Sequence, residues 1–194
     1  MVKYLMFCIC ITAGVLLYSL FPVSHGPGVT AEEKPKISDL TWQKPFTFNG
    51  ASLVPSKVIE AEVRILDKRR YFFDGLSHIS PVDVVIGWDE MSDERNLNYI
   101  YHDLSDRIFE TKISIPPIKL EAIHKQSDLW HLIPSDPSID NKIKSLRRGN
   151  IIAIEGTIVQ IETESGLIFN SPSSLLDSQN KKGFAIWVEQ LIVQ

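Results

Sequence analysis

An uninterrupted apolar segment near the N-terminus limits what this chain can fold into more than any other feature. The run YLMFCICITAGVLLYSLF, from Tyr4 to Phe21, holds no charged residue, proline or asparagine. As a helix it would span about 27 Å at a rise of about 1.5 Å per residue, close to the roughly 30 Å hydrocarbon core of a bilayer. The hydrophobic cores of signal peptides are shorter, at about 7–15 residues. The sequence therefore predicts a transmembrane anchor within residues 1–23 that contacts the lipid bilayer through residues 4–23, with a cleaved signal peptide as the alternative.

The charges that flank this segment predict its orientation. Lys3 and the terminal amine precede it, whereas the far flank begins with Glu32 and Glu33 and reaches its first lysines only at 34 and 36. Positively charged flanks stay on the cytoplasmic side of a membrane. We therefore expect a single-pass protein of the bacterial inner membrane whose C-terminal domain is periplasmic.

The remainder of the chain has the composition of one globular domain. Hydrophobic residues make up 44% and charged residues 23% of the 194 residues, which is ordinary for such a domain. The only cysteines, Cys8 and Cys10, lie in the apolar segment, so the domain has no disulfide and no cysteine metal site. The net charge of −4 does not suit a nucleic-acid-binding surface. We expect a flexible tether, rich in proline, glycine and charge, over residues 24–40 and an extracytoplasmic β-rich domain over 41–194.

Hydrophobic patterns predict a domain built largely of strands. Apolar residues alternate with charged ones from Val58 to Leu66, which is typical of a strand with one buried face. Gly156 interrupts a long apolar stretch, where a bulge or a close backbone approach is expected. Further strands are predicted over residues 107–115, 129–133, 151–162, 166–170 and 184–193.

Helix-start signals occur at two main places. Asp136-Pro137 predicts a helix that runs to about Leu146, and Ser80-Pro81-Val82-Asp83 predicts a short helix that Gly87 ends. The predicted fold is an N-terminal transmembrane helix plus an α+β domain, specifically a small OB-like or SH3-like β-barrel with short helices inserted. A β-sandwich is the alternative.

Two parts of the chain resemble a known group of proteins. They are SPVDVVIGWDEMSDE (residues 80–94) and the combination of WHLIPSD (130–136) with LRRGNIIAIEGTIVQIE (146–162). The chain resembles a group of uncharacterised bacterial membrane-anchored proteins with a single β-rich domain, over about residues 58–175. The resemblance implies no activity. A cysteine found in that group near the C-terminus has no counterpart in residues 183–186 here.

Candidate catalytic residues are few. His131 falls on a predicted strand, facing the core, where Asp128 or Asp136 could satisfy its nitrogens. Together with Ser173 and Asp177 it could form a hydrolytic site, although no GxSxG motif supports one and turn chemistry alone explains a serine-rich turn. The four histidines of the domain lack the spacing of a zinc site, so no metal is expected.

Candidate binding residues lie in the segment that carries the resemblance. Asp83, Trp88 and Asp89 could line a groove, although a lone tryptophan is more often part of the core and an acidic helix start is more often solvated. We expect a membrane-anchored extracytoplasmic binding or assembly module of unknown ligand in a bacterial envelope. Its partner would be a protein or a glycan, with no cofactor and no nucleic acid. The alternative function is an envelope hydrolase with a site near His131.

Overall fold

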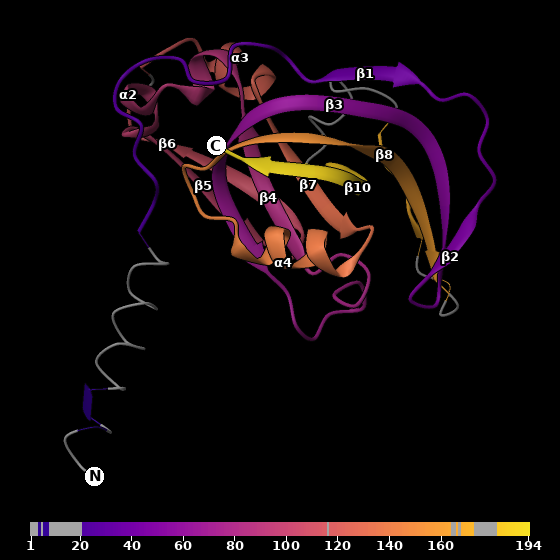
Figure 1. The fold of residues 1–194 in the computed structure, drawn as a ribbon. Helices are drawn as coiled ribbons and strands as arrows, with labels where there is room; N and C mark the ends of the chain where they lie inside the picture. Colours follow the sequence, from indigo (N-terminus) through magenta and orange to yellow (C-terminus); the bar gives the residue numbers. More distant parts are fainter. Residues whose placement is uncertain are drawn as a thin grey trace.

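The computed structural model describes residues 4, 6–7, 21–115, 117–163, 166, 168–172 and 182–194. Most of the regular structure is β, and eight strands pair in one sheet while two others form a separate hairpin (Figure 1). The strands are β1 (Lys36–Asp39), β2 (Phe46–Phe48), β3 (Ala51–Arg70), β4 (Val82–Gly87), β5 (Ile100–Ser105), β6 (Ile108–Ile113), β7 (Ser127–Pro134), β8 (Ile151–Thr163), β9 (Ile168–Phe169) and β10 (Phe184–Val193). The helices are η1 (Asp89–Ser92), α2 (Glu94–Leu97), α3 (Leu120–Lys125) and α4 (Pro137–Ser145).

The predicted membrane anchor is not borne out. Most of the apolar segment, including residues 8–20, lies outside the described residues. Within the described part of the chain, no helix is long and apolar enough to cross a membrane. This finding corrects the predicted transmembrane helix, and with it the predicted single-pass location in the bacterial inner membrane.

The sheet is organised around β3, which arches over the domain in Figure 1. Its first part, Ala51–Arg64, pairs with β8, and its last part, Arg64–Arg70, pairs with β4. Register shifts after Pro55 and after Ile65 bend the strand, as bulges do. β4 then pairs with β7, β7 runs parallel to β10, and β10 pairs with β8. The sheet therefore coils around a central core.

The predicted fold class is wrong. The domain is mostly β rather than α+β, with strands making up 47% of the described structure, and it is not a closed barrel. Closing a barrel removes sheet edges, whereas β1, β2 and β9 each pair with a single neighbouring strand. The OB-like or SH3-like barrel with inserted helices is therefore replaced by a coiled sheet that keeps its edge strands.

The helix predicted after Ser80 is in fact β4. All six residues of β4 are buried, and three of them are valines, whose branched side chains suit a strand. Val82, Val84 and Ile86 face the main core, and Asp83 and Val85 face the opposite side. A strand buried on both faces reads as a continuous apolar run, which is why the Ser-Pro-Val-Asp start signal misled the prediction.

α4 confirms the helix that was predicted from Asp136-Pro137. The Asp136 carboxylate accepts hydrogen bonds from the backbone N–H groups of Ser138 and Ile139, which caps the first turn. Ile139 and Ile143 are buried in the main core. Figure 1 shows the helix lying across one side of the coiled sheet, so it covers that end of the core.

Residues 23–31, the N-terminal strap, lie against the domain at the start of the predicted tether. The Glu94 carboxylate accepts from the Ser24 hydroxyl at 2.7 Å and from the His25 N–H at 2.9 Å. These contacts, together with the buried Arg64 at 3.2 Å, lower the pKa of Glu94 to about 2. Further along, Ala31 is fully buried. The strap is thus bonded to the domain through the η1–α2 segment.

Gly149 is the position where the strap approaches the domain most closely. Its φ is +85°, and a Cβ added there would lie 1.9 Å from the Val23 carbonyl oxygen. The backbone also binds here, because the Val23 N–H donates to the Arg148 carbonyl at 2.8 Å. Only glycine combines this backbone conformation with this approach.

We expect Gly149→Ala to destabilise the domain and to release the strap. The positive φ alone costs about 1–2 kcal/mol, and the clash with Val23 adds to it. Gly50→Ala is the matched control, because Gly50 has a φ of +76° but nothing within 4 Å of its added Cβ. Urea unfolding and limited proteolysis of residues 23–31 measure the two effects. Equal losses of stability with an equally protected strap would contradict this role of Gly149.

Candidate functional site

Asp83 and His131 are directly opposite each other on β4 and β7, on the outer face of the sheet. Asp83 is fully buried and His131 is 2% exposed. The His131 Nδ1 lies 2.8 Å from the Asp83 Oδ2, an ion-pair distance without the alignment of a hydrogen bond. The His131 Nε2 lies 2.8 Å from the Lys182 carbonyl oxygen, which can only accept, so Nε2 carries a proton. The Lys182 carbonyl therefore holds Nε2, and the carboxylate beside Nδ1 is that of Asp83 rather than of Asp128 or Asp136.

Arg107 extends this pair towards the surface. Its guanidinium donates to the Asp83 Oδ1 at 3.0 Å and makes two hydrogen bonds, of 2.7 and 2.9 Å, with the two carboxylate oxygens of Asp74. It also lies 4.3 Å from the centre of the Tyr71 ring, a cation–π distance. His131, Asp83, Arg107 and Asp74 thus form a continuous series of polar contacts, here called the ion chain.

The hairpin turn between β5 and β6 places Arg107 in the ion chain. Asp106 and Arg107 both have positive φ, at 49° and 61°, which turns the hairpin tightly and directs Arg107 inward. The Arg107 N–H donates to the Tyr71 hydroxyl at 3.2 Å. Burial raises the pKa of Tyr71 to about 12, and the negative charge of Asp83 adds to the shift. Tyr71 therefore stays neutral, and it contacts Arg107 through both its hydroxyl and its ring.

The outer end of the ion chain holds a loop, residues 69–76, which we call the aromatic loop. Phe73 is 99% exposed and Phe72 is 62% exposed, although Asp74 beside them is bound by Arg107. Arg69 and Arg70 are exposed as well, and the Arg70 guanidinium lies 4.8 Å from the centre of the Phe72 ring. Two neighbouring phenylalanines in water are costly for a folded protein and often mark a contact surface.

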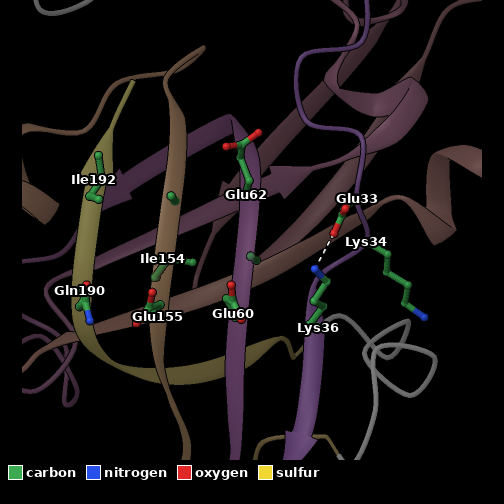
Figure 2. Close-up of a pocket in the computed structure, with 11 residues that line it drawn as sticks. Glu33, Lys34, Lys36, Glu60, Glu62, Ile154, Glu155, Gln190 and Ile192 are labelled. Carbon is green, nitrogen blue, oxygen red and sulfur yellow. Dashed lines mark ion pairs between the residues drawn. The ribbon is translucent and has the colours of Figure 1, made fainter.

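A second surface feature, the acidic groove, lies across β3, β8 and β10 beside β1 (Figure 2). It has a volume of about 300 Å³. Figure 2 shows Glu60, Glu155 and Gln190 side by side on the three strands, with the Glu33–Lys36 ion pair beside them. The lining residues are Glu33, Lys34, Lys36, Glu60, Ala61, Glu62, Ala153, Ile154, Glu155, Gln190 and Ile192.

The charges in this groove are not balanced locally. Glu60 and Glu155 are opposite each other in the β3–β8 register, and like charges in that position repel. Neither carboxylate takes part in an ion pair within the described part of the chain. Lys36 already binds Glu33 at 2.7 Å. The half-buried Ala153 and the exposed Ile192, which are paired across β8 and β10, give the groove its apolar surface, whereas Ala61 and Ile154 are buried in the main core.

Of the remaining predicted site residues, the structure describes Trp88 and Asp89, and neither contacts His131. Trp88 is 4% exposed and belongs to the main core. Asp89 is exposed, and its carboxylate accepts from the Gln126 side chain at 3.1 Å. Ser173 and Asp177 lie outside the described residues. Among the residues that the structure does describe, no group of acidic, histidine or cysteine side chains could hold a metal ion.

Most residues of the ion chain and of the aromatic loop were not predicted from the sequence. Arg107 was predicted only as the first residue of a strand, because the inward orientation of its side chain depends on the hairpin turn. The run Tyr71-Phe72-Phe73, between two arginines and an Asp-Gly turn, was a detectable signal, since three adjacent aromatics cannot all face one side of a strand.

Comparisons with known protein families, curated proteins and solved structures give no match for this chain. The resemblance described above therefore remains a prediction, and the site is interpreted from its own geometry.

We expect Arg107→Gln to destabilise the domain strongly, because it leaves Asp83 buried without its guanidinium partner. Breaking a buried ion pair from one side costs about 3–5 kcal/mol. Lys112→Gln is the control, because its ion pair with Asp103 is exposed and such pairs contribute about 0–1 kcal/mol. Urea unfolding measures the loss of unfolding free energy in each of the two variants. Similar losses from the two substitutions would show that the ion chain does not stabilise the fold.

His102 makes the stability of the domain depend on pH. Burial lowers its pKa from 6.5 to about 4, and Arg148 and His124 act in the same direction. Below pH 6.5 His102 becomes protonated in the unfolded chain, whereas in the folded domain it becomes protonated only near pH 4. The free energy of unfolding should therefore fall by about 3 kcal/mol between pH 7 and pH 4.

The test compares the wild type with His102→Gln, which cannot titrate. The difference between their unfolding free energies should shift in favour of the variant as the pH falls from 7 to 4. A difference that does not change with pH would contradict the shifted pKa.

Proposed function

We propose that this domain is a binding or assembly module whose contact element is the aromatic loop. The observation that carries this proposal is the near-complete exposure of Phe73 beside the exposed Phe72. Burying one such side chain in a partner contributes about 1.5–3 kcal/mol. The neighbouring Arg69 and Arg70 would favour a partner surface that is apolar and bordered by carboxylates.

The ion chain supports this proposal because it holds the loop in place before binding. Asp74 is bound by Arg107 through two hydrogen bonds, and the Tyr71 N–H donates to the Pro81 carbonyl at 2.9 Å at the base of the loop. A loop that is ordered in advance loses less conformational entropy on binding. Asp83 and His131 are then positioning residues beneath a contact surface. No observation favours a hydrolytic role for His131, since the side chain is buried and its Nε2 is bound to the Lys182 carbonyl.

The proposal is tested with a fluorescein-labelled peptide of four Glu-Leu repeats, titrated with the full chain and followed by fluorescence anisotropy. We expect the wild type to bind it, and Phe72→Ser/Phe73→Ser to weaken binding by at least about tenfold through lost burial. Added salt should also weaken binding, because it screens the arginines.

The matched control is Tyr99→Ser/Tyr101→Ser, which removes two other exposed aromatic residues. It should bind the peptide like the wild type. Equal weakening by both double substitutions, or none by the loop substitution, would contradict the proposed role of the aromatic loop.

A further inference from the structure

We infer that the partner of the aromatic loop is a second copy of this chain, which receives the loop in its acidic groove. The inference rests on the proposed function and goes further by naming the occupant. It predicts head-to-tail association, in which each copy offers a loop at one end and a groove at the other.

The two surfaces have complementary chemistry. The loop carries two arginines that form no ion pair within the described residues, beside two exposed phenylalanines. The groove carries Glu60 and Glu155, which form no ion pair within the described residues, beside the apolar Ala153 and Ile192. Lys36 lies opposite Glu60 in the β1–β3 register but already binds Glu33. Docking would place each arginine near a carboxylate and a phenyl ring against the 59% exposed Ile192. Both the exposed apolar surface of the loop and the repulsion between Glu60 and Glu155 would then be relieved.

The positions of these surfaces exclude contact within one copy. Glu60 lies in the middle of β3 and Arg70 at its end, so about 33 Å of strand separates them at about 3.3 Å per residue. In Figure 1 the groove region around β1, β3 and β8 is at the top, and the connection from β3 to β4 passes below α4 at the bottom. Different surfaces therefore meet, and such a heterologous contact leaves a free loop and a free groove at the ends of every assembly that does not close into a ring.

The test follows association of the full chain by sedimentation velocity over a range of protein concentrations in a mild non-ionic detergent. The loop variant is Phe72→Ser/Phe73→Ser and the groove variant is Glu60→Lys/Glu155→Lys. The control, Glu110→Lys/Glu162→Lys, makes the same change of charge on exposed glutamates outside the groove lining. Circular dichroism verifies that all variants are folded.

We expect the wild type and the control to form assemblies larger than dimers as the protein concentration rises. The loop variant and the groove variant, here called the blocked variants, should each associate at least about tenfold more weakly. An equal mixture of the two blocked variants should form dimers and stop there, because it contains one usable loop and one usable groove per pair. A monomeric wild type, blocked variants that associate like the wild type, or a mixture without dimers would overturn the inference. If the wild type is monomeric but still binds the Glu-Leu peptide through its loop, self-association fails while the proposed binding function stands.

Discussion

The arrangement of the outer face of the domain depends on one buried negative charge, that of Asp83. A carboxylate with no exposed surface must be matched by a cation, and here Arg107 reaches it from the β5–β6 hairpin. The same guanidinium binds Asp74 in the aromatic loop. These ion pairs thus join the hairpin to β4 and to the aromatic loop, in addition to the apolar packing of Ile100 and Leu104 with Val85. Any loop conformation that removes Arg107 from Asp83 is excluded by the cost of an unmatched buried charge.

This construction separates the stability of the domain from the composition of its contact surface. The main core is formed by aliphatic side chains inside the coiled sheet, together with Trp88, Trp130 and Phe184. Phe72 and Phe73 contribute nothing to that core because they lie in solvent. Their positions are set instead by the neighbours that the ion chain holds. The surface can therefore vary in sequence without loss of the fold, as long as Asp74 and Arg107 remain paired.

Local patterns were enough to locate most strands and α4, because those elements carry their signals in consecutive residues. They failed where structure depends on distant parts of the chain. Asp83 and His131 were each singled out as candidates, but only the β4–β7 register shows that they are partners. β4 itself looked like a helix because burial on both faces removes the alternation of a strand. The barrel was predicted from sparsely placed helices and a terminal run of strands with a mid-strand glycine, which do not reveal that β1, β2 and β9 remain edges.

The N-terminal strap has a mechanical consequence. Ser24, His25 and Gly26 all bond to the single carboxylate of Glu94, and Gly28 bonds to Asp93 next to it. A pulling force applied to the chain before Val23 would load these bonds before it reached the β-sheet. The strap therefore works as a shear attachment that spreads tension over several hydrogen bonds. Because Glu94 also binds Arg64 on β3, such tension would be passed to the strand around which the whole sheet is organised.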